Sequence, residues 1–239
     1  MNSRFTYLIG IGAPLLALLL IGGVSLEKFA VGPVGQRIND TPAGEIRGSI
    51  TIGQLFTAPY NGLYRIDVLM ATYARQNTHD VTFHLRSSPQ ADNDLVKITV
   101  NAREIEDNQF RPFTFEPLRD SAGKSYYFFF DSPDSEPGDA VTVWGTIKDL
   151  YPEGRPFRNH RKAGGDLVFL TYYRPSLLDK FNILLDRLTA NKPLFWGDRR
   201  FYLLLAPLYM ALLSLFIVQV IKIPSREEKD SDDEVGNST

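Results

Sequence analysis

The sequence has 239 residues, of which 44% are hydrophobic and 23% are charged, so it suits one folded domain with additional segments and excludes a disordered or collagen-like polymer. It contains no cysteine, which excludes disulfide scaffolds, zinc fingers, thiol catalysis and iron–sulfur clusters. Basic and acidic side chains are equal in number between residues 27 and 221. This neutral balance argues against nucleic-acid binding, which calls for a strongly basic surface.

Two apolar segments predict membrane spans. Residues 5–26 carry no charge, and a helix of this length, at about 1.5 Å per residue, covers the roughly 30 Å of a bilayer core. Residues 201–223 form a second such run, with one charge at Lys222 near its end. A cleaved signal peptide is the alternative for the first run, although its apolar part is longer than the usual 7 to 15 residues or so. Neither run has the polar stripe of a helix at the surface of a soluble domain.

Basic residues predict that both termini face the cytoplasm. Arg4 precedes the first span. Three basic residues lie at or after the C-terminal end of the second span: Lys222, Arg226 and Lys229. Residues 1–4 are then a cytoplasmic N-terminus, and residues 224–239 a disordered acidic cytoplasmic tail. Trp196 and Tyr202 are expected in the outer interface of the cytoplasmic (plasma) membrane, with the central domain outside it.

Short apolar stretches after a lead-in at residues 27–44 predict β-strands separated by turns. Alternation is clearest from Val81 to Arg86, where Val, Phe and Leu face inward and Thr, His and Arg face solvent. Because no helical pattern intervenes, the sequence predicts a mainly β fold, an antiparallel jelly-roll-like β-sandwich over residues 45–173 between the two spans. The predicted strands are 45–52, 55–58, 63–73, 80–87, 95–102, 110–118, 124–132, 140–147 and 166–173.

The same region resembles a known class of modules. The stretch Gln54 to Pro59 with Gly62 and Leu63, the stretch Asp120 to Phe128, and Val141 to Trp144 are similar to strands and turns of jelly-roll, carbohydrate-binding-module-like β-sandwiches. Such modules occur in membrane-anchored bacterial envelope and polysaccharide-assembly proteins. The resemblance implies the fold and a glycan-related role, and it carries over no ligand site residue by residue.

An amphipathic helix is predicted over residues 175–191. Its apolar face consists of six side chains at helical spacing: Leu177, Leu178, Phe181, Leu184, Leu185 and Leu188. The helix either packs on the sandwich or lies in the outer membrane interface, and the nearby span favours the membrane.

Motifs for catalysis are absent from the sequence. It contains no Gly-x-Ser-x-Gly, no Gly-x-Gly-x-x-Gly and no P-loop, so we predict no enzymatic activity, no cofactor and no metal site, with an unrecognised hydrolase as a third alternative. His79 and His84 are expected to be surface histidines on opposite faces of a strand. The acidic turn at residues 131–139 is interpreted as a polar hairpin, with calcium binding as its alternative.

Two groups of residues are candidates for binding. The long loop at 152–165 holds a basic cluster for lipid headgroups, an anionic glycan or an acidic partner, unless it is simply solvated: Arg155, Arg158, His160, Arg161 and Lys162. Trp144 should point away from the core, with Tyr127 or Phe129 on a nearby outer face, where aromatic rings stack on sugars or bury against a partner. In the alternative, the 152–165 loop or the amphipathic helix covers these rings.

These features together predict a non-enzymatic membrane protein, anchored at both ends, that presents its β-sandwich for glycan recognition or envelope assembly. The alternative is an accessory subunit that packs against a larger membrane enzyme or transporter. The partners expected are therefore the lipid bilayer, a glycan or polysaccharide, and a membrane protein.

Overall fold

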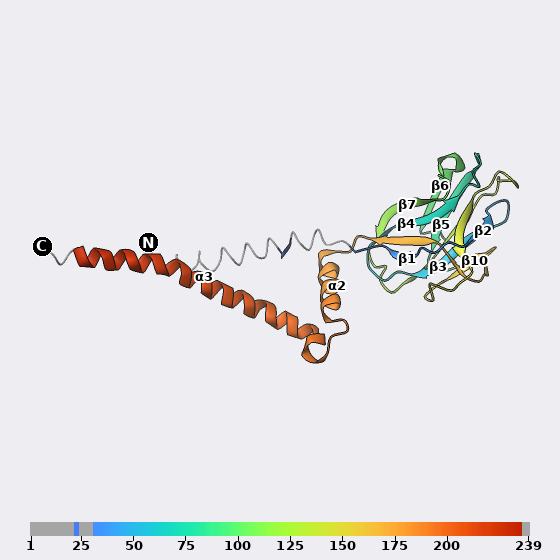
Figure 1. Ribbon diagram of the computed structural model, residues 1–239. Helices are drawn as coiled ribbons and strands as arrows, with labels where there is room; N and C mark the ends of the chain where they lie inside the picture. Colours follow the sequence, from blue (N-terminus) through green and yellow to red (C-terminus); the bar gives the residue numbers. More distant parts are fainter. Residues whose placement is uncertain (1–21, 24–30, 236–239) are drawn as a thin grey trace. The chain divides into compact units, whose positions relative to one another are not determined.

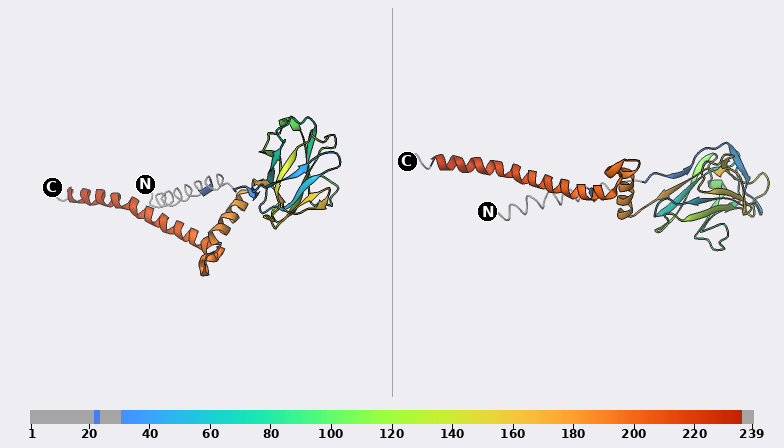
Figure 2. Two further views of the ribbon diagram at one scale, coloured as in Figure 1. Left: turned by 45° about the vertical axis from the view of Figure 1, so that its right-hand side comes forward. Right: turned by 90° about the horizontal axis from the view of Figure 1, so that it is seen from below.

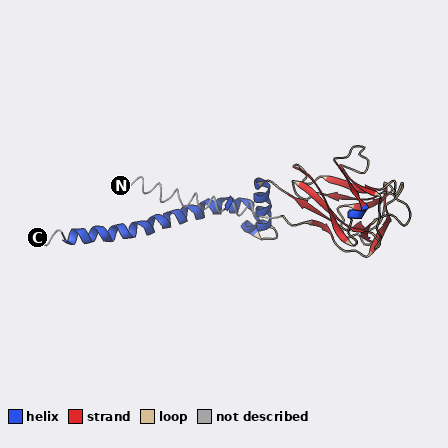
Figure 3. Cartoon of the chain, turned by 90° about the horizontal axis from the view of Figure 1, so that it is seen from above, coloured by secondary structure: helices blue, strands red, loops and turns tan. Residues whose placement is uncertain are grey.

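The computed structural model describes residues 22–23 and 31–235 (Figure 1). The chain divides into two compact units. The first unit extends from Val31 to Ser176, and the second includes the chain from Leu177 onward. The strands belong to the first unit and the long helices to the second (Figure 3). Apart from residues 22 and 23, the predicted first span at 5–26 lies outside the described residues.

The larger sheet of the first unit has seven antiparallel strands. β4 pairs with β7, β9 and β13; β1 extends the sheet beyond β13, and β2 and β12 pair with β9. The bounds are β1 Val34–Gln36, β2 Thr41–Glu45, β4 Leu63–Ala71, β7 Gln109–Leu118, β9 Thr142–Thr146, β12 Asp166–Leu167 and β13 Phe169–Tyr173.

The second sheet has six antiparallel strands in the order β11-β10-β3-β8-β5-β6. A 3-10 turn, η1 (Ala102–Glu104), follows β6 and leads to β7 in the other sheet. The bounds are β3 Ile52–Thr57, β5 Asp80–Arg86, β6 Val96–Asn101, β8 Ser125–Asp131, β10 Arg155–Arg158 and β11 Arg161–Lys162.

The two sheets pack face to face around an aromatic core (Figure 2). Phe83 of β5 stacks on Phe113 of β7 with ring centroids 4.6 Å apart, and Phe128 of β8 meets Phe169 of β13 at 5.6 Å. These four side chains are at most 1% exposed, so each joins one sheet to the other. The prediction of a mainly β, antiparallel sandwich is confirmed.

Several strand boundaries differ from the prediction. β1 and β2 lie in the predicted lead-in at residues 27–44, and both are short strands outside the centre of their sheet, rich in Gly and Pro. The strands predicted at 45–52 and 55–58 are instead a loop followed by β3. The apolar residues of the loop still pack into the core. Ile46 is fully buried, and its N–H donates a hydrogen bond to the carbonyl oxygen of Val141 over 2.9 Å, while Ile50 packs against the core.

The chain enters and leaves the sandwich at the same end. β1 is antiparallel to β13, with Val34 opposite Thr171. The hydroxyl of Thr171 also donates a hydrogen bond to the carbonyl oxygen of Val34 over 2.7 Å. Residues 31–33 and 174–176 therefore extend from the same end of two neighbouring strands.

The second unit contains α2 (Leu177–Thr189), the 3-10 turn η2 (Leu194–Gly197) and α3 (Arg199–Val235). α2 falls within the predicted amphipathic segment, and its apolar side chains Leu177, Leu178 and Phe181 are exposed. Within the described residues, α3 is the one helix whose length and composition would allow it to cross a membrane, through the segment Arg199–Phe216. The backbone of α3 stays helical as far as Val235, so most of the tail predicted as disordered is helical; its Glu, Lys and Arg residues extend an existing helix favourably.

Candidate functional site

The basic segment at residues 152–165 is a β-hairpin and not the long loop that its sequence predicts. Phe157 pairs with Lys162 and Arg158 with Arg161, which leaves a two-residue turn of Asn159 and His160. Both turn residues have positive φ, 50° and 59°, as the tightest hairpin turns require. The hairpin extends the six-stranded sheet because β10 also pairs with β3.

Within the part of the chain that the structure describes, the cations of this hairpin lack acidic partners. Arg155, Arg158, Arg161 and Lys162 are all exposed, and none of them belongs to an ion pair in the described part of the chain. Arg158 and Arg161 lie directly opposite each other, an arrangement in which like charges repel. An anion bound between them would relieve that repulsion.

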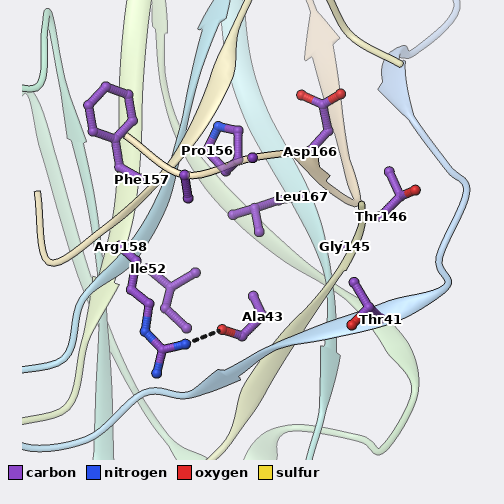
Figure 4. A pocket seen from close by; sticks show the side chains of 12 residues that line it. Thr41, Ala43, Ile52, Gly145, Thr146, Pro156, Phe157, Arg158, Asp166 and Leu167 are labelled. Carbon is purple, nitrogen blue, oxygen red and sulfur yellow. Dashed lines mark hydrogen bonds between the residues drawn. The ribbon is translucent and has the colours of Figure 1, made fainter. Parts of the chain in front are cut away.

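A pocket of about 160 Å³ opens between the sheets beside this hairpin (Figure 4). Its walls come from β2, β3, β9, β10 and β12, and the residues are Thr41, Ala43, Ile52, Gly145, Thr146, Pro156, Phe157, Arg158, Ala163, Gly164, Asp166 and Leu167. Figure 4 shows the Arg158 guanidinium reaching toward β2, where its Nη1 donates a hydrogen bond to the carbonyl oxygen of Ala43 over 3.2 Å. The pocket thus combines apolar walls with one guanidinium.

Gly44 makes room for that guanidinium. Its φ is +100°, a backbone conformation that residues other than glycine rarely adopt, and a Cβ at this position would lie 2.9 Å from Nη1 of Arg158. The guanidinium has five donors, and the contact with Ala43 uses one of them. The remaining donors suit a carboxylate or a phosphate, which guanidinium groups bind in a bidentate way.

Asp166, although it lines the pocket, is committed to the fold. Its carboxylate accepts hydrogen bonds from Gln54 Nε2 at 3.1 Å and from the backbone N–H groups of Leu150 and Tyr151 at 2.7 and 2.8 Å. Burial raises the pKa of Asp166, against the effect of these donors. Gln54 also accepts a hydrogen bond from the N–H of Leu167, so the pair ties β3 to β12 across the two sheets.

The predicted aromatic residues Tyr127 and Phe129 lie on the outer face of the six-stranded sheet, where other side chains cover them. Their rings are 0% and 3% exposed. Phe157 packs on Tyr127 and His160 on Phe129, with ring centroids 5.2 and 5.4 Å apart. The hairpin therefore covers these rings, as the alternative interpretation expected, and they do not form an open stacking surface. Gly53 permits the close packing, since a Cβ there would lie 2.6 Å from Cβ of Phe129.

His84 is buried on the same face, so its interpretation as a surface histidine is wrong. Its ring stacks on Phe129 at 4.4 Å, with Nδ1 2.7 Å from Asp94 and Nε2 3.2 Å from Asp131. Burial disfavours the charged ring, but the hydrogen bonds and charges of Asp131 and Asp94 outweigh it and raise the pKa of His84. Arg86 completes the cluster, with Nε 2.6 Å from Asp94 and its guanidinium over the Phe129 ring.

Trp144 lies on β9, in the other sheet. Its neighbour Val143 points into the core, so Trp144 faces outward, half-buried, and its indole N–H donates to Asn108 Oδ1 over 2.7 Å. The structure therefore separates Trp144 from Tyr127 and Phe129, which belong to the six-stranded sheet. These three residues do not form one site.

The acidic turn at residues 131–139 is linked by hydrogen bonds to the loop before β5. Thr78 donates to Asp139 through its N–H at 2.8 Å and its hydroxyl at 2.7 Å, which lowers the pKa of that carboxyl. His79 Nε2 lies 3.4 Å from Asp139. In residues 22–23 and 31–235, no group of three or more acidic or histidine side chains is arranged to hold a metal ion.

The predicted interface residues belong to an aromatic group at the start of α3. Trp196 is 45% exposed, and its ring centroid lies 4.9 Å from that of Phe195 and 5.0 Å from that of Phe201. Tyr202 contacts Phe201 at 5.3 Å and accepts a hydrogen bond from Lys192. Aromatic groups of this kind are typical of segments at a membrane surface.

Comparison with known proteins gives no match: no family model fits the sequence, and no curated protein matches it.

Proposed function

We propose that this chain is a non-enzymatic protein of the cytoplasmic membrane that presents a jelly-roll-like sandwich on the outer side and binds an anionic glycan there. The binding site is the β10–β11 hairpin with the adjoining pocket. In this proposal residues 5–26 and the apolar part of α3 both span the membrane, and both termini are cytoplasmic.

The site is supported by the basic side chains of the hairpin, which have no acidic partners among the described residues. Four of them lie on one hairpin, and Arg158 also lines a pocket whose other walls are largely apolar. A sugar bearing a carboxylate or phosphate presents both kinds of surface, an apolar ring face and an anion. Because the pocket is small, it suits one such substituent, while Arg155, Arg161 and Lys162 would contact neighbouring units of the polymer.

Anchoring at both ends is supported by the topology of the sandwich. The segments before β1 and after β13 leave the sandwich at the same end of two neighbouring strands, which suits a domain with a membrane span on each side of it in the sequence. The apolar segment Arg199–Phe216 supplies one span by its length and composition, and residues 5–26 match the requirement by sequence. The whole sandwich, with its basic hairpin, would then lie outside the membrane.

Binding to a uronic-acid polysaccharide and to its carboxyl-reduced, neutral counterpart tests the site. With the full chain in detergent, Arg158→Gln should weaken binding to the acidic polymer by about 10-fold or more, since hydrogen bonds to charged groups contribute about 1.5 to 3 kcal/mol. The matched control is Arg103→Gln, which removes another exposed arginine that belongs to no ion pair among the described residues, and this variant should bind as the parent does. Equal binding of the neutral polymer, or no effect of Arg158→Gln, would contradict the proposal.

One observation favours the accessory-subunit alternative. Ile38 and Ile147 are 56% and 77% exposed, and the N–H of Ile147 donates a hydrogen bond to the carboxylate of Asp40, which follows Ile38 by two residues. Exposed apolar groups of this kind are typical of protein interfaces. Purification in mild detergent distinguishes the two functions: a stoichiometric partner that is lost in Ile147→Asp supports the subunit, and a lone protein retained on acidic polysaccharide supports the glycan binder.

A further inference from the structure

An apolar groove of about 440 Å³ lies between α2 and α3. α2 contributes Phe181, Leu184, Leu185 and Leu188, and α3 contributes Tyr202, Leu203, Leu205, Ala206 and Tyr209. Apart from the two tyrosine hydroxyls, these side chains carry no polar atom. One wall of this apolar groove thus belongs to the segment Arg199–Phe216, which is able to cross a membrane by its length and composition.

One end of the groove is basic. Tyr202, which lines the groove, donates its hydroxyl to the carbonyl oxygen of Leu188 and accepts from Nζ of Lys192, both over 3.4 Å. Lys192 also lines a shallow hollow with Arg199, Arg200 and Asp198, so the hollow holds three cations and one carboxylate, which accepts a hydrogen bond from the backbone N–H of Arg200 over 2.8 Å. Asp186 pairs with Arg199, whereas Lys192 and Arg200 belong to no ion pair in the described part of the chain.

We infer that the groove binds an acyl chain of an anionic phospholipid, whose phosphate lies at Lys192 and Arg200. The inference rests on the proposed insertion of α3 into a bilayer. The surrounding lipid tails are as apolar as leucine, so an acyl chain alone gains little by leaving them. Selection must come from the headgroup. Lys192 and Arg200, which belong to no ion pair among the described residues, favour a negatively charged headgroup at this end of the groove.

The polarity of the site identifies its occupant. A second apolar helix would fill the groove but would have no use for cations at its mouth. A phospholipid has an apolar chain and a phosphate joined end to end, in the same order as the groove and its basic end. The occupant is thus a lipid of the membrane itself.

Lipid analysis of the purified full chain tests this inference. The protein is reconstituted in bilayers of equal parts phosphatidylglycerol and phosphatidylcholine with identical acyl chains, extracted in mild detergent, and its bound lipid is quantified by mass spectrometry. We expect bound phosphatidylglycerol to exceed phosphatidylcholine at about one lipid per chain. Lys192→Gln and Arg200→Gln should each reduce that excess about fivefold.

Two further variants separate the headgroup from the groove. Lys180→Gln removes a basic residue near the other end of α2 and should leave the excess unchanged. Ala206→Leu narrows the groove without adding charge and should lower the retention of both lipids, with helix content checked by circular dichroism. An excess that is absent from the parent, insensitive to Lys192 and Arg200, or abolished by Lys180→Gln would overturn the inference.

The two proposals fail in different ways. Extraction of membranes with alkaline carbonate shows whether the chain is embedded. A chain that is embedded but retains no excess of anionic lipid overturns the lipid site and leaves the anchoring intact. A chain that carbonate releases overturns both.

Discussion

Replacing Tyr127 by phenylalanine should stabilise the sandwich. The ring of Tyr127 is fully buried between Phe129 and Phe157, and its hydroxyl has no hydrogen-bond partner among the described residues. The same burial raises the pKa of the hydroxyl well above its ordinary value. A buried polar group without a partner destabilises the folded state by about 1 to 3 kcal/mol, and Tyr127→Phe removes that group while keeping the ring. The free energy of unfolding should therefore rise by about 1 kcal/mol or more.

Tyr151→Phe is the matched control, because it should have the opposite effect. The hydroxyl of Tyr151 donates a hydrogen bond to the carbonyl oxygen of Thr57 over 3.0 Å. Burial is the main reason that the pKa of Tyr151 is raised to about 12. Removing this hydroxyl loses a bond that contributes about 0.5 to 1.5 kcal/mol.

Thermal unfolding of the full chain in one detergent, followed by near-ultraviolet circular dichroism, measures both changes. For a domain of this size, 1 kcal/mol corresponds to roughly 3 °C in Tm. Tyr127→Phe should melt about 3 °C or more above the parent, and Tyr151→Phe below it. If Tyr127→Phe melts below the parent as well, its hydroxyl has a partner such as a buried water, and the reasoning is refuted.

Three other predictions concern the histidine cluster, the separate tryptophan and the topology. In the folded state the pKa of His84 is raised above its ordinary value of 6.5. The stability that the charged ring contributes is therefore complete below pH 6.5, and it is lost as the pH rises through the pKa of the folded state. Between about pH 6 and pH 9, Tm should fall less in His84→Gln than in the parent. Phe83→Ala should lower the free energy of unfolding by about 3 to 5 kcal/mol, and Trp144→Ala, at a half-buried position, by clearly less, which chemical denaturation would measure. The native chain has no cysteine, so single cysteines report topology. Ser88→Cys should react with a membrane-impermeant thiol reagent in intact cells, and Ser231→Cys only after permeabilisation. Labelling of Ser231→Cys from outside would contradict two spans with cytoplasmic ends.

The sandwich was predictable where the sequence alternates over a whole strand. The period of two from Val81 to Arg86 places Val81, Phe83 and Leu85 in the core, as the structure does. The same pattern wrongly predicts that His84 is exposed, because an outward-facing side chain on a strand is exposed only if no other side chain packs over it. Asp94, which binds His84, belongs to the loop before β6, and no local pattern indicates that contact.

The hairpin at the candidate site was hidden for a related reason. Two-residue turns with positive φ are usually marked by glycine, and here Asn159 and His160 adopt that conformation instead. The segment therefore looked like a loop, although its basic residues were evident. That Phe157 would cover Tyr127 depends on the register of β10 against β3, which only the folded chain fixes.

The pairing of β1 with β13 has a consequence for the order in which the protein is made. Val34 and Thr171 are 137 residues apart, so the first strand finds its partner only after nearly the whole sandwich has emerged from the ribosome. Contacts between such distant residues form late and slow folding. Until then, the backbone of β1 lacks the partner with which it pairs in the folded chain. We therefore expect a late step of folding to join the two ends of the domain.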